Sequence, residues 1–474
     1  MKKTLSLLFF IISITMFSQL KKEWGSKFDY DEKKETNPNV VLVDNYNHYM
    51  VSIINIDGGM MPTNQIIIRK FDQKNQLVNT FIEEFPHKNV FTLHNFLGSF
   101  ELGTDKLAIF TDCYSNKTKK KEIHKIIFYK KKSTFTTTLV AEFTFESLSK
   151  SGDANIRSSQ NKNYISIIYG KYNNKKIEEN YECIVLDGKT SDLVWQKNIS
   201  FPLQSYTENM ILTNSGKIVF IRNSKETGSK NILAIADGNT IENKNIEENI
   251  QIYEPMAFSI GTQDYLIAFN NPIRTISINS GNFENILLYD LNSGKILKNN
   301  SLKIFNAIKD LQYVHFNTIF VQNNEIHLFV DCTFQTGTKP NPTFPNSTIK
   351  VPVYSNGNPS LLVFSMDGEF KNNIFLGSNP VDNNLIKSFG VLNIKGDYYI
   401  NTGFYSGFDK LNAPNFTKTH KYNFDPDHLE LDDYKYGIII NQFCNYLPDS
   451  KRALFAKSFD NGKIAFLSVL GLDL

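Results

Sequence analysis

A cluster of acidic side chains near the end of the sequence has the chemistry to bind a hard cation. The stretch NFDPDHLELDD, residues 423–433, contains the carboxylates Asp425, Asp427, Glu430, Asp432 and Asp433. Calcium coordinates about six to eight oxygen ligands, many of them carboxylates. The stretch lacks the central glycine and the terminal bidentate Glu of an EF-hand loop. We therefore expect a solvated acidic loop here, and a calcium site of another kind is the alternative.

Aromatic side chains stand among polar residues in two long segments, residues 333–359 and 406–451. These aromatic residues are Phe334, Phe344, Tyr354, Phe408, Phe416, Tyr422 and Phe424. The first segment also contains five prolines, which restrict its unbound conformations and lower the entropy cost of binding. Exposed rings among polar residues suit contacts with protein or glycan. We predict a binding surface here, and the alternative is that the rings pack the segments onto the domain.

Five apolar runs end in a polar residue at matching places: Asp112, Arg222, Asn270, Asp331 and Asn401. If the runs are equivalent strands, these side chains lie on the same face and line the mouth of a central channel. Ordinary solvated strand ends are the alternative. Asp112 and Asp331 are the first candidates for a pair of glycosidase carboxyl groups, which lie about 5–10 Å apart.

The cysteines do not form a recognisable metal or disulfide pattern. Cys113, Cys183, Cys332 and Cys444 are too few and too scattered for a disulfide framework. They include no CxxC pair and have no neighbouring His, so their spacing predicts no zinc site. We expect buried, unpaired thiols. The sequence also lacks a nucleophile elbow, a Walker loop, a dinucleotide fingerprint and an HExxH motif.

Two sequence patterns that alternate along the chain predict the strands on which these residues lie. The first is a polar turn followed by an apolar strand, as in KLAIFTD from Lys106 and KIVFIRN from Lys217. The second is an apolar strand, a tight polar turn and another strand, as in IVLDGKTSDLVW from Ile184. The pair recurs roughly every 50 to 70 residues. Each unit therefore holds four antiparallel strands, called a to d, which is typical of a propeller blade.

The predicted fold is all-β: a single β-propeller of about seven four-stranded blades, with about six to eight compatible with the spacing. It occupies residues 38–474, with the long segments 333–359 and 406–451 as b–c loops on one face. Residues 19–37 form a tail or an added strand. The stretch YKYGIIINQF from Tyr434 is an extra strand or part of an eighth blade. A stack of β-sandwiches is the rival fold, although no linker rich in Pro, Gly or Ser separates the units.

Two of the hairpins resemble a known family. VLDGKTSDLVW, from Val185 to Trp195, is similar to the repeat of pyrroloquinoline-quinone-type propellers, and YDLNSGKIL from Tyr289 is similar but lacks the Trp. Such repeats occur in quinone-dependent dehydrogenases and in non-enzymatic periplasmic scaffolds of outer-membrane assembly. Because Trp24 and Trp195 are the only tryptophans, the regular tryptophan docking of the dehydrogenases is mostly missing. The resemblance therefore points towards the scaffolds.

The N-terminus predicts export. Lys2 and Lys3 precede an apolar stretch from Leu5 to Phe17, and Ser18 is a small residue at the expected cleavage position. An uncleaved anchor helix is the alternative, but the stretch is short for a bilayer. The formal charge of +3 falls to about +1 without Lys2 and Lys3, which argues against a nucleic-acid partner.

We therefore expect an exported, non-enzymatic binding or scaffold propeller in the periplasm, at the outer membrane or outside the cell. Its partner would be another protein, such as a membrane-associated subunit of a transport, secretion or assembly complex, with a glycan as a further option. We expect no cofactor other than calcium, and no transmembrane segment in the mature chain. The alternative function is an enzyme, either a glycan hydrolase or a quinone-dependent dehydrogenase.

Overall fold

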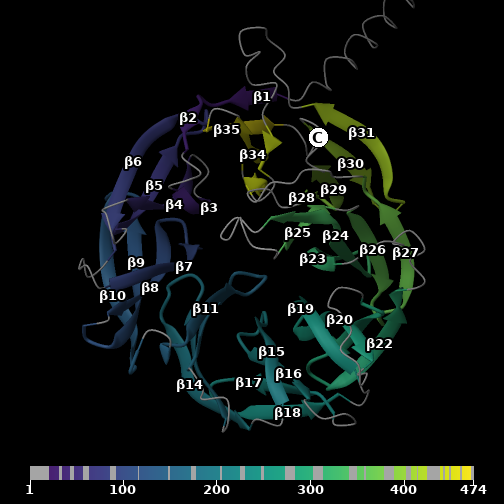
Figure 1. The fold of residues 1–474 in the computed structure, drawn as a ribbon. Helices are drawn as coiled ribbons and strands as arrows, with labels where there is room; N and C mark the ends of the chain where they lie inside the picture. The colour runs from purple at the N-terminus through teal and green to yellow at the C-terminus, as the bar shows by residue number, and fades with distance from the viewer. Residues whose placement is uncertain are drawn as a thin grey trace, which may run out of the picture.

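The computed structural model arranges the chain as a ring of β-sheets around a central axis (Figure 1). It describes residues 21–30, 35–42, 47–56, 63–85, 92–115, 117–147, 150–171, 178–202, 205–224, 230–246, 250–272, 283–302, 313–340, 350–356, 359–377, 389–401, 407–413, 415–423, 438–440, 443–447, 450–459 and 462–470. These residues form eight sheets. The all-β propeller is confirmed, and the number of blades is eight.

The first four blades each contain four consecutive antiparallel strands. Blade one is β3 (Glu35–Leu42), β4 (His48–Ile56), β5 (Thr63–Phe71) and β6 (Leu77–Glu84). Blade two is β7 (Thr92–Leu102), β8 (Lys106–Ser115), β9 (Lys120–Tyr129) and β10 (Thr134–Thr144). Blade three is β11 (Asp153–Ser158), β12 (Tyr164–Gly170), β13 (Glu178–Asp187) and β14 (Leu193–Pro202). Blade four is β15 (Ser205–Leu212), β16 (Ile218–Ser224), β17 (Ile232–Ala236) and β18 (Ile241–Asn245).

The next three blades follow the same order, with one addition in blade six. Blade five is β19 (Ile250–Ile260), β20 (Gln263–Pro272), β21 (Asn285–Asp290) and β22 (Lys295–Ser301). Blade six is β23 (Tyr313–Gln322), β24 (Glu325–Pro340), β26 (Ser360–Ser365) and β27 (Phe370–Phe375), with β25 (Lys350–Asn356) paired to β24. Blade seven is β28 (Gly390–Ile394), β29 (Asp397–Asn401), β30 (Gly407–Asn412) and β31 (Thr417–Asn423). In each blade strand a lies nearest the axis and strand d on the rim (Figure 1).

The eighth blade joins the two ends of the chain. Its inner strands are β32 (Ile438–Ile439), β33 (Asn445–Leu447) and β34 (Arg452–Phe459), followed by β35 (Lys463–Leu470). The N-terminal strands β1 (Lys21–Trp24) and β2 (Phe28–Asp29) pair with the outer side of β35. Strand β1 is therefore an added outer strand, and YKYGIIINQF contributes to an eighth blade.

The predicted b–c loop at residues 406–451 is wrong. Its first part forms β30 and β31, the c and d strands of blade seven. The sequence pattern missed this hairpin because its c strand, GFDKLN, is short and largely polar. The turn also lacks the expected glycine, and Phe416 adopts the positive φ of 52° instead.

The apolar core lies between the blades. The described buried side chains form eight clusters, and each cluster combines residues from two neighbouring blades. For example, Leu107 and Ile109 of blade two pack with Val51 and Ile66 of blade one. Because each sheet has two apolar faces, a blade can bury both of them only inside a closed ring. This arrangement rules out the rival stack of separate β-sandwiches.

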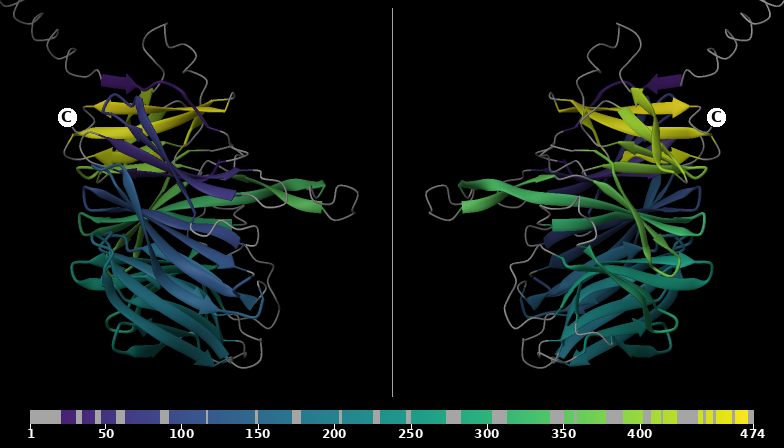
Figure 2. Two further views of the ribbon diagram at one scale, coloured as in Figure 1. Left: turned by 90° about the vertical axis from the view of Figure 1, so that its left-hand side faces the viewer. Right: turned by 90° about the vertical axis from the view of Figure 1, so that its right-hand side faces the viewer.

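Among the described residues, the connection between β24 and β26 extends beyond the ring (Figure 2). Strand β24 continues beyond blade six and forms a hairpin with β25, which Figure 2 shows in green, projecting well beyond one face. The predicted signal peptide, residues 1–18, lies outside the described residues. Within the part of the chain that the structure describes, no helix has the length and apolarity needed to cross a bilayer.

Candidate functional site

The hairpin of blade six projects from the ring (Figure 2). Residues 325–330 of β24 pair with β26 inside the blade, and the last of these pairs joins Val330 to Ser360. From Thr333 to Pro340 the same strand pairs with β25. We call residues 333–340 and 350–356 the sixth-blade arm. The arm thus corresponds to the predicted loop at 333–359, which contains a two-stranded ladder.

The structure separates the seven predicted aromatic residues into three groups. Phe334 and Tyr354 belong to the arm, where Phe334 is paired with Ser355 and Tyr354 with Gln335. Phe344 and Phe424 lie outside the described residues. Phe408 and Phe416 are 3% and 7% exposed and belong to the apolar clusters on either side of blade seven. Tyr422 is partly buried against Phe408, with ring centroids 4.8 Å apart.

The prediction of an exposed surface is therefore wrong for Phe408 and Phe416. Phe408 occupies an inward position on β30, and Phe416 closes the turn after it. The alternation of Phe408 with polar residues reflects strand periodicity, whereas Phe416 is a turn residue with a positive φ.

Four of the predicted channel-mouth residues are buried inside the sheets. Asp112, Arg222, Asn270 and Asn401 each expose at most 2% of their surface. All four lie near the end of a b strand, as predicted, but their side chains form hydrogen bonds or ion pairs within the protein. Asn270 donates to Asn299 Oδ1 at 2.9 Å, and Asn401 donates to the Gly407 carbonyl. The side chain of Asp331 lies outside the described residues.

Arg222 and the Asp112–Lys121 pair connect neighbouring blades. The Arg222 guanidinium lies 2.6 Å from Glu179 Oε2 of blade three and also donates to Thr207 Oγ1 at 2.7 Å. The Asp112 carboxylate lies 3.1 Å from Lys121 Nζ, which donates to the Gly152 carbonyl at the start of blade three. The prediction that Asp112 and Arg222 line an open channel mouth is wrong, because each residue is buried and forms an ion pair within the protein. The predicted calcium loop, residues 425–433, lies outside the described residues.

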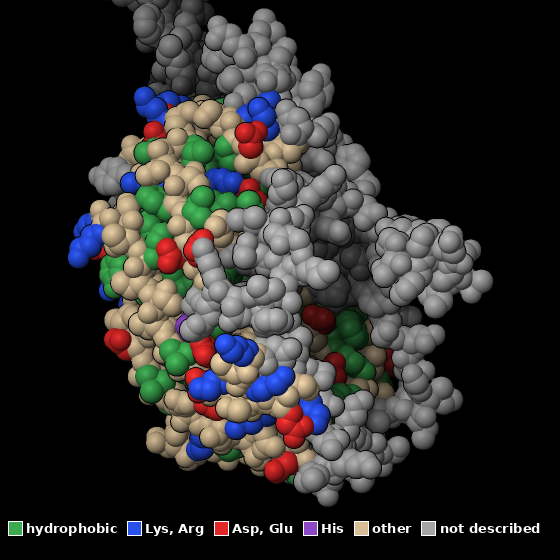
Figure 3. Space-filling view, turned by 60° about the vertical axis from the view of Figure 1, so that its left-hand side comes forward, with side chains coloured by type: hydrophobic (Ala, Val, Ile, Leu, Met, Phe, Trp, Pro, Cys, Tyr) green, Lys and Arg blue, Asp and Glu red, His purple; other side chains and the backbone are tan. Residues whose placement is uncertain are grey.

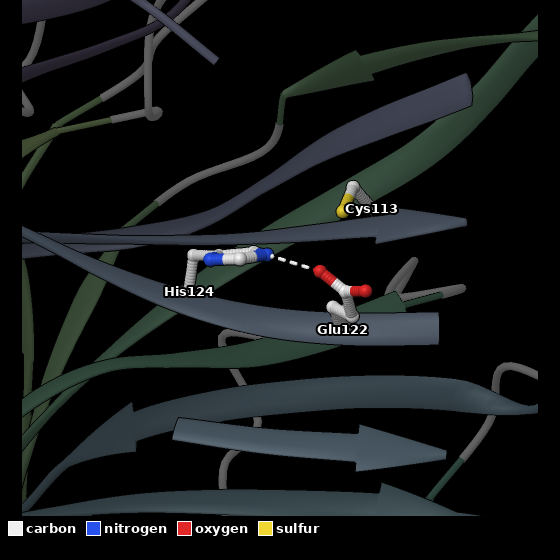
Figure 4. Close-up of side chains that lie close together, drawn as sticks. All are labelled: Cys113, Glu122 and His124. Atoms are coloured by element: carbon white, nitrogen blue, oxygen red, sulfur yellow. Dashed lines mark hydrogen bonds and ion pairs between the residues drawn. The ribbon is translucent and has the colours of Figure 1, made fainter. Parts of the chain in front are cut away.

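The structure brings together a group of donor side chains that sequence reasoning missed. Cys113 lies near the end of strand b of blade two, and Glu122 and His124 lie in the first half of strand c (Figure 4). Cys113 is paired directly with Glu122, and His124 Nε2 lies 2.8 Å from Glu122 Oε2. One donor atom from each residue lies within 4.8 Å of the other two. An E-x-H pattern on a strand that follows a Cys across a short turn was the available signal.

The described cysteines are unpaired thiols, as expected. Cys113 and Cys183 are buried and Cys444 is partly buried. Burial raises the pKa of Cys113 to about 12, and the nearby Glu122 and Asp112 carboxylates add to this shift. Burial likewise raises the pKa of Cys183 and of Cys444 to about 12.

The described part of the rim exposes several large apolar side chains. On the side seen in Figure 3, they alternate with charged and other polar groups. The large exposed ones belong to the outer strands, with Ile82 on β6, Leu139 on β10 and Leu193 on β14 at 55%, 53% and 60% exposure. The described residues on the side seen in Figure 3 therefore do not single out an apolar binding patch.

No protein-family model and no curated protein matches this chain. Among solved structures, it is similar to an acylaminoacyl peptidase from Pyrococcus horikoshii, with 11% identity over 91% of this chain and a TM-score of 0.38. The match spans 58% of that peptidase. The β-propeller domain of the Trilobed protease from Pyrococcus furiosus has 13% identity, with 82% and 96% of the two chains covered and a TM-score of 0.38.

A third similar structure is an α-L-arabinofuranosidase from Fusarium graminearum, with 12% identity, 69% and 94% of the chains covered and a TM-score of 0.31. Similarity at this level carries no argument about function. The resemblance of two hairpins to quinone-type repeats likewise gains no support from a family model.

Proposed function

We propose that this chain is an exported, non-enzymatic propeller that binds another protein through the sixth-blade arm. The observation that carries the proposal is the arm itself, a two-stranded ladder that projects from a closed ring (Figure 2). A two-stranded hairpin is marginally stable in water without further packing. A binding partner would provide that packing.

The backbone of the arm could also form hydrogen bonds with a strand of the partner. Among the described strands, the part of β24 beyond Thr333 pairs with β25 alone. Strand edges of this kind are templates for an added strand, and many domains recognise partners by this β-augmentation. The aromatic residues Phe334 and Tyr354 lie on the two arm strands and supply candidates for side-chain anchors. This combination supports a protein partner more than a small ligand.

The proposed location rests on the sequence. The basic and apolar pattern of residues 1–18 supports export, and a partner subunit of an outer-membrane or periplasmic complex follows from the scaffold interpretation. The hydrolase alternative has lost one of its two first candidates, because the Asp112 carboxylate is buried in an ion pair with Lys121. A carboxylate held in this way is a poor acid or base for an external substrate.

Purification of the tagged protein from native membranes tests the proposal. We expect a partner in stoichiometric amounts with the wild type and its loss from a variant in which residues 335–358 are replaced by a short Gly-Ser linker. A variant with Leu193→Ser on the rim should retain the partner. A wild-type protein that is monomeric and without a partner in native membranes would contradict the proposal.

A further inference from the structure

The Cys113, Glu122 and His124 group lies at a blade boundary rather than on the open surface. Side chains alternate between the two faces of a strand. Leu107 and Ile109 of β8 pack against blade one, whereas Ala108 and Phe110 pack against blade three. Cys113 therefore faces blade one, and Glu122 and His124 share that face with Ile126 of β9. The group is at the b–c end of blade two.

The geometry is close to that of a metal shell. In a tetrahedral zinc site the donor atoms lie about 2.0–2.3 Å from the ion, and hence about 3.3–3.7 Å from one another. Here the donor atoms lie within 4.8 Å of each other, with the His124 to Glu122 contact at 2.8 Å. Small rotations of Glu122 and His124 would place the three donors around one ion. The sheet register already places Cys113 and Glu122 directly opposite one another.

The donor types select the class of metal. Thiolate and imidazole favour zinc and other borderline or soft ions, whereas calcium and magnesium prefer shells made of oxygen alone. A thiolate and a carboxylate together balance the charge of a divalent cation. This balance matters because the His124 and Glu122 side chains are 7% and 15% exposed, and an uncompensated charge at such a site is costly.

One further histidine occupies a neighbouring position in the strand register. His94 of β7 holds the register position opposite Cys113 on the other side from Glu122. Three protein ligands leave a zinc ion with an open position, and four close it. The test below distinguishes these two forms.

We propose that Cys113, Glu122 and His124 form a site for a divalent zinc-type ion that ties strands b and c of blade two together beside blade one. This site is independent of the proposed function, because it lies in the ring and not in the sixth-blade arm. It also differs from the calcium loop considered from the sequence, both in position and in chemistry.

Metal titration of the full mature chain tests the site. The protein, carrying a tag without histidines, is stripped with a chelator and titrated with Zn²⁺ against a chromophoric competitor. We expect one equivalent to bind, and Co²⁺ to give the absorption of a thiolate-to-cobalt charge transfer. Loss of a group that only orients a zinc ligand weakens binding by about 10- to 100-fold. Cys113→Ser and His124→Gln, which remove ligands themselves, should therefore weaken it by at least about a hundredfold.

Cys183→Ser is the matched control, because Cys183 is also buried and unpaired but belongs to the neighbouring blade. It should leave the zinc affinity and the cobalt spectrum unchanged. Circular dichroism checks that each variant is folded. If either Cys113→Ser or His124→Gln fails to fold, the other variant still tests the site. If His94→Ala also weakens binding, His94 completes a closed site, and if it does not, the ion keeps an open position. The proposal is overturned if the wild type binds no Zn²⁺, or if the folded Cys113→Ser and His124→Gln proteins bind it as tightly as the wild type.

Discussion

Buried charged side chains near the ends of the b strands stabilise contacts between blades. Arg222 shows this most clearly, because its guanidinium donates to Glu179, Ser205 and Thr207 and to the carbonyl of Pro202. Its side chain is 2% exposed, whereas that of Glu179 is 20% exposed. Loss of Arg222 would leave several buried acceptors unpaired, together with a carboxylate that water reaches poorly.

We predict that Arg222→Met lowers the free energy of unfolding by about 3 kcal/mol or more, because breaking a buried pair costs far more than breaking an exposed one. The midpoint of urea unfolding measures the change. Lys298→Met is the control, since the Lys298–Glu369 pair is 44% and 65% exposed and should contribute less than about 1 kcal/mol. Equal midpoint shifts in the two variants would contradict this assignment.

His48 leads to a second prediction at the scale of single residues, which concerns how the stability of the protein depends on pH. It is fully buried, with its ring stacked on Phe71 at 4.9 Å and in edge contact with Phe466 at 4.5 Å. Burial, and secondarily the Arg452 charge, hold the pKa of His48 well below 6.5 in the folded state. Below pH 6.5 the unfolded chain therefore binds a proton that the folded protein does not.

This residue should make the protein less stable as pH falls below about 6.5, by up to about 1.4 kcal/mol per pH unit until the folded pKa is reached. His48→Phe removes this contribution while keeping the aromatic contacts. Urea unfolding at several pH values between 7.5 and 4.5 should show a shallower loss of stability for His48→Phe than for the wild type. Parallel curves would show that His48 does not titrate in this way.

The sequence identified polar residues at equivalent strand ends but assigned them the wrong surroundings. A single strand shows that Asp112 or Arg222 is near its end. It does not show that Asp112 will pair with Lys121 of the neighbouring strand, or Arg222 with Glu179 of the neighbouring blade. The Cys113, Glu122 and His124 group was missed for the same reason, since its donors become neighbours through cross-strand register.

At the scale of elements, the closure of the ring depends on short N-terminal strands. Phe28 follows β1 and lies between the two ends of the ring, 5.0 Å from the Phe71 ring of blade one and 5.9 Å from the Phe466 ring of blade eight. It is 6% exposed. Tyr30, which is also buried, belongs to the same apolar cluster.

We predict that Phe28→Ala destabilises the protein by about 3–5 kcal/mol, the usual cost of removing a buried phenyl ring. Phe375→Ala is the matched control, because Phe375 is 48% exposed on the rim strand β27 and its loss should change stability by less than about 1 kcal/mol. Thermal or urea unfolding compares the two variants. A Phe28→Ala protein as stable as the control would mean that the N-terminal strands do not hold the ring closed.

Most strands could be predicted because the b and c strands are dense in β-branched and aromatic residues and their turns contain Asp, Asn or Gly. In the hairpin at Asp187, the carboxylate accepts bonds from the backbone N–H groups of Lys189 and Thr190, both at 2.8 Å. Blade seven was harder, because its c strand and turn lack these features. The short strands of blade eight come from both ends of the chain, and no local pattern indicates such a pairing.

At the scale of the whole molecule, the apolar clusters between blades make the ring one continuously packed body. Trp195 illustrates the contact, because its indole N–H donates to the Gly216 carbonyl of the next blade at 3.0 Å. Gly216 has a φ of 79°, a conformation that glycine adopts without strain. Such a body can carry the sixth-blade arm without depending on it, since the arm residues beyond Thr333 pair with no blade strand among those described.

The most direct test of the account is the affinity of the arm-shortened protein for the partner recovered with the wild type. Replacing residues 335–358 by a short linker should leave the unfolding midpoint nearly unchanged, because surface loops contribute little to stability. It should weaken partner binding by well over tenfold, since an aromatic anchor at an interface is worth about 2 kcal/mol or more. If the shortened protein folds normally and binds the partner with the affinity of the wild type, the sixth-blade arm is not the recognition surface.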